Sequence, residues 1–71
     1  MIYSMKSELS YYRLYLLRFL KEQEDERAND DEFIEARADA AEIEYEERRR
    51  DGLTVDQAQE LAMAVLLEGF D

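Results

Sequence analysis

The sequence contains no cysteine, no histidine and no proline, and it has only two glycines. Without cysteine there are no disulfides and no thiolate chemistry, and without histidine the usual imidazole acid–base catalyst and zinc ligand are missing. We therefore expect no catalytic residue, no cofactor-binding site and no metal site, and a chain that is not an enzyme.

Long apolar runs are also missing, since none approaches the roughly 18 residues that a membrane-spanning helix needs. The first residues, MIYSMK, lack the basic segment, apolar stretch and cleavage site of a signal peptide. We therefore expect a cytoplasmic protein with no membrane partner. Met5 is an alternative start to Met1, which would make residues 1–4 a short extension.

Acidic residues dominate what is present, with a formal net charge of −10. Between Glu22 and Glu47 thirteen acidic residues face two arginines, whereas Lys6 to Lys21 carries four basic residues and a single glutamate. This separation favours a basic first helix screened by an acidic second one within the same bundle.

The stretch from Glu8 to Lys21 predicts a helix that is apolar on two sides. At 100° per residue, the larger apolar face contains Leu9, Tyr11, Tyr12, Tyr15, Leu16, Phe19 and Leu20. Leu14 and Leu17 lie on the opposite side, and a helix apolar on two sides needs cover on both. Ser7 is the expected N-cap, with Ser4 as the alternative, and a break is expected between Glu24 and Asn29. The helix is therefore placed at about residues 7–23.

A second helix is predicted at about residues 30–51. Asn29 with Glu32 has the spacing of a capping box, and Gly52 suits the left-handed residue that ends a helix. One stripe contains Ile34, Ala38, Ala41 and Tyr45, and a second contains Phe33, Ala36, Ala40 and Ile43. A solvated acidic face is expected at Glu32, Glu35, Asp39, Glu42 and Glu46. This pattern predicts a middle helix with one neighbour on each stripe.

A third helix is predicted at about residues 54–68, capped by Thr54 with Gln57 at the capping-box position. Its expected core stripe consists of Val55, Ala58, Leu61, Ala62, Val65 and Leu66, with Phe70 folding back on the last turn. Met63 and Leu67 fall outside this stripe. Leu14, Leu17, Met63 and Leu67 would then be exposed in a lone chain, so we expect an all-α three-helix bundle completed by homodimerisation through these residues.

Three charged residues, Arg37, Glu44 and Arg48, lie between the two stripes of the second helix. Glu44 and Arg48 have the spacing of a helical ion pair. The simpler interpretation of Arg37 is a side chain whose stem covers the core, and the sharper one is a bidentate contact with a carboxylate, on a partner for instance.

The acidic residues Asp30, Asp31, Glu32 and Glu35 could suggest a cation site, but a solvated face explains them better. Tyr11, Tyr12 and Tyr15, interleaved with Arg13 and Arg18, could stack on nucleic acid bases, but helical spacing favours a core, and the negative charge repels phosphate. We therefore expect no direct nucleic acid partner. The favoured function is a non-enzymatic interaction or accessory protein that binds itself or another protein. The alternative is an acidic DNA mimic or regulatory protein that binds a basic DNA-binding partner.

Several segments together resemble a family that carries a domain of unknown function. They are Glu8-Leu9-Ser10-Tyr11-Tyr12-Arg13-Leu14 with Leu16-Leu17, Phe33-Ile34 with Arg37-Ala38-Asp39, and Ala58, Leu61-Ala62, Val65-Leu66 and Gly69. Its members are small acidic helical proteins of Bacteroides-type bacteria, often encoded with conjugative transposons, and this chain is similar to the N-terminal half of a usual member. The resemblance implies an all-α fold and a mobile-element context, and it implies no reaction. Self-association would cover the faces that the second half covers in longer members.

Overall fold

The first helix, α1, spans Tyr3–Glu22 in the computed structural model, which describes the backbone of residues 3–70 and the side chains of residues 11–70. The alternative starts at Met1 and Met5 and the predicted core position of Leu9 lie outside the described side chains. The helix already includes Ser7, so the predicted N-cap there is wrong. No proline or glycine precedes Ser7 to stop the helix from continuing back.

The break after α1 falls in the predicted region and contains a short 3₁₀ helix, η1, at Glu26–Asn29. Two hydrogen bonds end α1, from Asp25 N to Leu20 O at 2.9 Å and from Glu24 N to Lys21 O at 3.0 Å. This is the Schellman arrangement, which requires a left-handed residue, and Glu24 occupies that position with a φ of 55°. A glutamate here is unusual, because a side chain makes the left-handed conformation costly.

The second helix, α2, spans Asp31–Arg50, and its N-cap is Asp30, whose carboxylate accepts from Phe33 N at 3.1 Å. The predicted N-cap at Asn29 is therefore wrong, because Asn29 is the last residue of η1. The predicted end is confirmed: Gly52 has a φ of 98° and follows the C-cap.

The third helix, α3, spans Val55–Leu66 and begins with the predicted capping box. Gln57 N donates to Thr54 Oγ1 at 3.1 Å, and Thr54 N donates to Gln57 Oε1 at 3.0 Å. These reciprocal bonds satisfy two of the free N–H groups at the start of the helix. The structure therefore confirms an all-α fold with three main helices.

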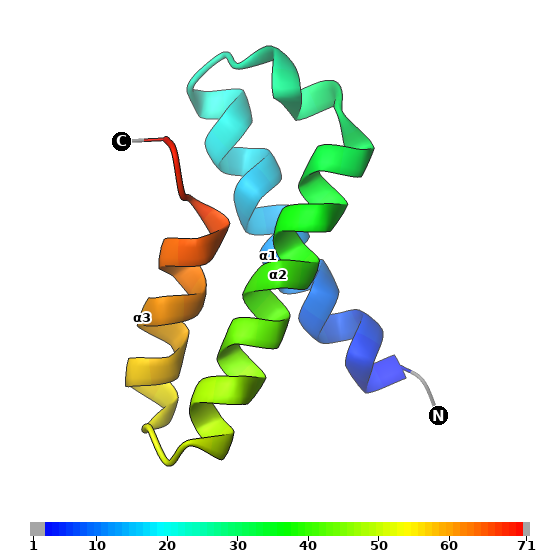
Figure 1. Cartoon of the computed structure of the whole chain (residues 1–71). Helices are drawn as coiled ribbons and strands as arrows, with labels where there is room; N and C mark the ends of the chain where they lie inside the picture. The colour runs from blue at the N-terminus through cyan, green and yellow to red at the C-terminus, as the bar shows by residue number, and fades with distance from the viewer. Residues whose placement is uncertain (1–2, 71) are drawn as a thin grey trace.

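The helices form two layers. Figure 1 shows α2 and α3 side by side and antiparallel, with α1 crossing behind α2. The Cα atoms extend over 37 × 32 × 15 Å. The short dimension is that of two stacked helices, whose axes lie about 8–10 Å apart and whose Cα atoms lie about 2.3 Å from each axis. Each layer therefore has one face that the other layer does not cover. None of the helices in the described part of the chain is long and apolar enough to cross a membrane.

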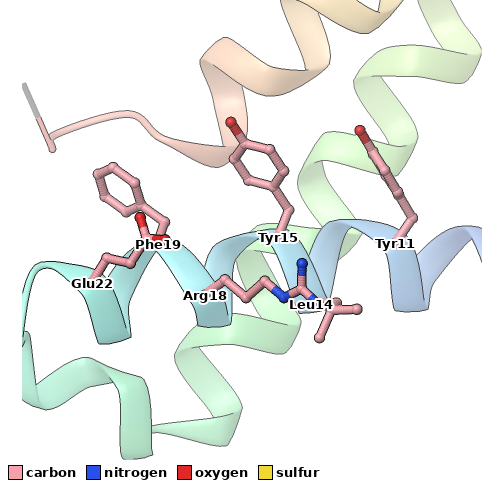
Figure 2. A pocket seen from close by; sticks show the side chains of 6 residues that line it. All are labelled: Tyr11, Leu14, Tyr15, Arg18, Phe19 and Glu22. Carbon is pink, nitrogen blue, oxygen red and sulfur yellow. The ribbon is translucent and has the colours of Figure 1, made fainter.

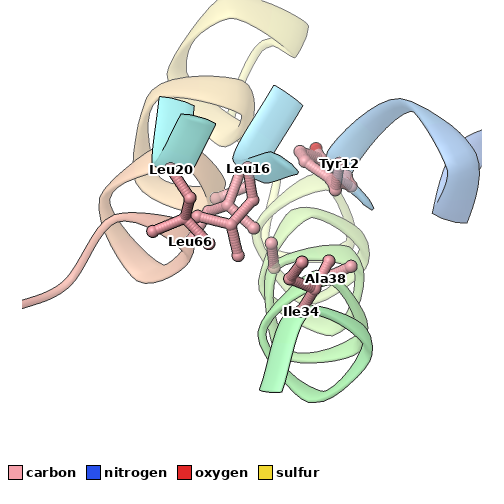
Figure 3. Close-up of a cluster of buried hydrophobic side chains, with 8 residues drawn as sticks. Tyr12, Leu16, Leu20, Ile34, Ala38 and Leu66 are labelled. Carbon is pink, nitrogen blue, oxygen red and sulfur yellow. The ribbon is translucent and has the colours of Figure 1, made fainter. Parts of the chain in front are cut away.

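The core lies where α1 crosses the α2–α3 hairpin (Figure 3). Leu16 and Leu20 of α1 and Leu66 of α3 are its largest completely buried side chains, and Tyr12 and Ile34 are nearly buried. Four alanines, Ala38, Ala41, Ala58 and Ala62, are also completely buried. Their small side chains let the backbone of α2 lie close to those of its neighbours. The core therefore consists largely of these close helix contacts and of the three leucines.

The second stripe predicted on α2 is not covered. Ala36, Ala40 and Ile43 are exposed, although Phe33 is half-buried at the end of the stripe. Both neighbouring helices pack at or beside the first stripe, since Ile34, Ala38 and Ala41 are its buried residues. The prediction of one neighbour on each stripe is therefore wrong.

The buried side of α3 is rotated from the predicted one. Val55 and Leu61 are exposed, whereas Met63 and Leu67 pack partly buried against the core. Gln59, Met63 and Leu67 share one row at four-residue spacing, and Gln59 hydrogen-bonds Tyr12 of α1. This row therefore lies on the side of α3 that α1 approaches.

Candidate interaction surface

One side of α1, next to the side that carries the buried Leu16 and Leu20, carries a regular series of large exposed side chains. We define the α1 outer face as Tyr11, Leu14, Tyr15 and Arg18, four residues that Figure 2 shows along the same helix. Tyr11 and Leu14 are each 50% exposed and Tyr15 is 42% exposed. Spacings of three and four residues place all four on one face of a helix. The exposed face thus combines two tyrosines of the predicted larger apolar face with Leu14 of the opposite one, and the single chain leaves it uncovered.

Hydrogen bonds to α3 position the tyrosines. The Tyr12 hydroxyl donates to Gln59 Oε1 at 2.8 Å, and Gln59 Nε2 donates to the Tyr11 hydroxyl at 3.2 Å. The Tyr11 and Tyr12 rings meet edge to face with centroids 5.2 Å apart, and the Tyr15 ring lies 6.4 Å from Tyr11. One glutamine of α3 therefore fixes the orientation of an exposed aromatic group on α1.

Shallow hollows flank Leu14 on both sides. One, of about 320 Å³, is lined by the α1 outer face with Phe19 and Glu22. Another, of about 270 Å³, is lined by Arg13, Leu14, Leu17 and Ile34. Leu14 thus forms a ridge between two depressions, which is a shape that interdigitates with side chains of another helix better than it encloses a small ligand.

The charge around this surface differs from that of the rest of the molecule. Arg13, Arg18 and Lys21 are exposed on α1, whereas the exposed face of α2 carries Glu32, Glu35, Asp39 and Glu46. Glu42 was expected among these acidic residues, but it is only 9% exposed. It lines a third hollow with Tyr12 of α1 and Gln59 of α3, so the crossing of α1 covers it. The predicted acidic series is interrupted at its centre.

The four residues predicted to mediate self-association do not form one exposed group. Leu14 is half exposed, whereas Leu17, Met63 and Leu67 pack partly buried against the core. The expectation that all four would be exposed in a single chain is wrong for these three. Met63 and Leu67 lie on the side of α3 that α1 approaches, and Leu17 of α1 lies near Ile34 of α2. Self-association through Leu14 stays a prediction.

Arg37 binds the end of α3 and lies apart from the other two predicted polar residues. Its Nη1 donates to the carbonyl oxygens of Leu66 at 3.1 Å and Glu68 at 2.8 Å. These carbonyls have no partner within the helix. A cation at this position also interacts favourably with the negative end of the helix dipole. The partner of Arg37 is thus main-chain oxygen of this chain, and the structure shows no carboxylate in that role among the described residues. Glu44 and Arg48 form the expected pair at 3.2 Å, and Arg48 also lies 3.0 Å from Asp51.

Aromatic rings and a second arginine complete this region, which we name the C-terminal clasp: Arg27, Arg37, Phe19, Phe33 and Phe70. The Phe70 ring lies 5.5 Å from that of Phe19 and 6.1 Å from that of Phe33. The guanidinium of Arg27 lies 4.4 Å from the centre of the Phe70 ring, and that of Arg37 lies 5.1 Å from the Phe33 ring. Phe70 was predicted to fold back on the last turn of the third helix; the structure instead shows it held by rings of α1 and α2 and by cation–π contacts.

Asp25 holds Arg27 in place through two oxygens. Arg27 Nη2 donates to Asp25 Oδ2 at 2.7 Å, and Arg27 Nε donates to Oδ1 at 3.0 Å. These side-chain hydrogen bonds, followed by the one from the Arg27 main-chain N–H, lower the pKa of the Asp25 carboxyl from 3.8 to about 2. The pair is structural, since Asp25 is also the N-cap of η1.

The acidic residues that begin α2 do not converge. Across the described residues, no group of three or more carboxylates is placed to hold a metal ion. Sequence reasoning also missed Gln59, the residue that orients the tyrosines. The sequence does contain an indication of this role, because the polar Gln59 lies in the same row of α3 as the apolar Met63 and Leu67.

Comparison with known proteins identifies a family. A family model described as Domain of unknown function (DUF1896) matches residues 4–71. No curated protein and no solved structure matches the chain. The resemblance to a family carrying a domain of unknown function is thereby confirmed, whereas its bacterial source and its association with conjugative transposons stay predictions.

Proposed function

Because this chain belongs to the DUF1896 family, whose description assigns no activity, we propose its function from its geometry. It is a non-enzymatic interaction module that binds another polypeptide through the α1 outer face. The proposal rests on one observation: Tyr11, Leu14 and Tyr15 stand in helical register on the same face, each 42–50% exposed.

The chemistry of this face supports protein binding. Single exposed apolar side chains are ordinary, but a continuous group at helical spacing suits contact with another protein. Tyrosine and arginine are also enriched in interfaces and among the residues that dominate binding energy. The ridge at Leu14 and the hollows beside it offer shape as well as area.

The fixed position of the tyrosines supports the same function. Ordering a free side chain during binding costs roughly 0.5–1.5 kcal/mol. Tyr11 is already bonded to Gln59 and packed on Tyr12, so less of this cost remains when a partner binds. The DNA mimic is less well supported, because the burial of Glu42 interrupts the acidic series on which that alternative depends.

Site-specific photo-crosslinking in the native host tests the proposal. A benzophenone amino acid replaces Leu14 in one variant and Ile43 of α2 in the control, two positions that are each 50% exposed in the wild-type chain. We expect irradiation to produce a discrete polypeptide adduct from position 14 and much less from position 43. If neither variant forms a protein adduct, or if both do so equally, the α1 outer face is not a binding surface.

A further inference from the structure

We propose that the polypeptide bound by the α1 outer face is a second copy of this chain, with the two α1 helices antiparallel about a two-fold axis. This inference rests on the proposed function, and it adds the identity and geometry of the partner.

The surface area of the chain supports a missing neighbour. A folded monomer of 8.5 kDa exposes about 4,700 Å² by the usual scaling with mass, whereas this chain exposes 5278 Å². The difference of about 600 Å² agrees with the thin, two-layer shape of the molecule, in which the α1 outer face has no neighbour within the chain. The radius of gyration, 12.3 Å, likewise exceeds the roughly 11 Å expected for a compact chain of this length.

The α1 outer face is complementary to itself. Its four positions, 11, 14, 15 and 18, are symmetric about the point between Leu14 and Tyr15. A two-fold axis through that point places Tyr11 of one copy opposite Arg18 of the other, and Leu14 opposite Tyr15. The two-fold axis produces each pairing twice. The Tyr11–Arg18 pairs make cation–π contacts, and the Leu14–Tyr15 pairs pack together at the apolar centre of the interface. The face therefore has the self-matching pattern that an isologous dimer requires.

Charge also favours this face over the others. The chain carries a formal net charge of −10, so contact between two acidic α2 faces would be repulsive. In a two-fold dimer each face meets its own copy, and the α1 outer face brings a single charge per copy, Arg18, whereas the exposed α2 face brings four carboxylates. In the antiparallel arrangement the two Arg18 side chains lie at opposite ends, about 10 Å apart along the helix direction.

Cysteine crosslinking tests this arrangement cleanly, because the natural chain has no cysteine. In the proposed dimer the two positions 14 are nearly level, and packed helices bring such inward positions within disulfide range. We expect oxidised Leu14→Cys to form a reducible dimer of twice the 8.5 kDa chain mass, at least tenfold more than the equally exposed control Ile43→Cys. Equal crosslinking of the two variants would overturn the proposal.

Sedimentation of the unmodified chain provides the second measurement. We expect the wild type to sediment as a dimer and Leu14→Lys as a monomer with an unchanged circular dichroism spectrum. Arg18→Glu, which alters an exposed charge, gives the same test if Leu14→Lys does not fold. If the wild-type chain stays monomeric when its concentration in the sedimentation experiment is raised 100-fold, the self-pairing is overturned. Photo-crosslinking from position 14 to a different polypeptide would then still support the interaction module.

Discussion

Replacing Arg37 with methionine tests whether the C-terminal clasp holds α3 on the bundle. Methionine keeps an unbranched stem but removes the donors that bind the carbonyls of Leu66 and Glu68. A hydrogen bond involving a charged group contributes about 1.5–3 kcal/mol, and the partial exposure of Arg37 argues for the lower end. The cation–π contact with Phe33 adds about 0.5 kcal/mol. We expect a loss of about 2 kcal/mol in the free energy of unfolding.

Urea denaturation followed by circular dichroism measures this loss. A chain of this size has a total stability of roughly 4–10 kcal/mol, so the loss is a large fraction of it. With a denaturant dependence of about 1 kcal/mol per molar urea, the midpoint should fall by about 2 M. Arg37→Lys keeps the charge without the planar fork and should lie between the wild type and Arg37→Met.

Arg50→Met is the matched control, because Arg50 is exposed at the opposite end of the same helix. Its free energy of unfolding should change by no more than about 0.5 kcal/mol, as expected for an exposed surface substitution, so its midpoint should stay close to that of the wild type. Hydrogen exchange should also show faster exchange at the Phe70 amide in Arg37→Met alone. Equal midpoints for the Arg37→Met and Arg50→Met variants would refute the clasp as a source of stability.

Four further substitutions test other features of the fold. Glu24→Gly should raise stability by about 0.5–1 kcal/mol in thermal melts, because glycine relieves the left-handed conformation at this position; an unchanged melting temperature would contradict that reasoning. Asp25→Asn should be less stable than the wild type near neutral pH. Because the folded state lowers the Asp25 pKa from 3.8 to about 2, the stabilising contribution is complete above about pH 5 and is lost as pH falls through 2, so the two urea midpoints should converge at the acid end. Leu16→Ala removes a completely buried side chain and should cost about 2–5 kcal/mol, enough to leave much of the chain unfolded by circular dichroism at 25 °C. Tyr12→Phe should lower the free energy of unfolding by about 1 kcal/mol, because the hydrogen bond to Gln59 is lost. If that bond is responsible, the same substitution should lower it by less in a chain that already carries Gln59→Leu.

Local rules predicted the features that depend on neighbouring residues. Thr54 and Gln57 cap α3 as expected, because both bonds join groups within four residues of each other. Gly52 likewise adopts the left-handed conformation that the end of α2 requires. The exception is informative: Asn29 lost its expected capping role because η1 occupies the connection and shifts the cap to Asp30.

Features that depend on where one helix crosses another were not predictable from periodicity. The spacing of apolar residues gives the angle of a stripe on its own helix, but it does not identify the neighbour that covers it. Met63 was expected outside and Leu61 inside, yet the crossing of α1 reversed both. The same crossing buried Glu42 and left Tyr11 and Tyr15 outside the core.

The Arg37 contact shows a different kind of limit. Sequence position indicated a long cationic side chain between two apolar stripes, with a carboxylate as one expected partner. The observed acceptors are main-chain oxygens, which every residue has and which leave no trace in the order of side chains. Only the tertiary arrangement of α2 and α3 reveals such a partner.

The four completely buried alanines restrict how this molecule can diverge. At Ala38, Ala41, Ala58 and Ala62 a longer side chain has nowhere to go without forcing two helices apart. Substitutions are therefore tolerated mainly at outward-facing positions, where they alter recognition and leave the packing of the helices intact. Chains built on this frame could acquire different binding preferences while keeping the same methyl-sized contacts at their centre.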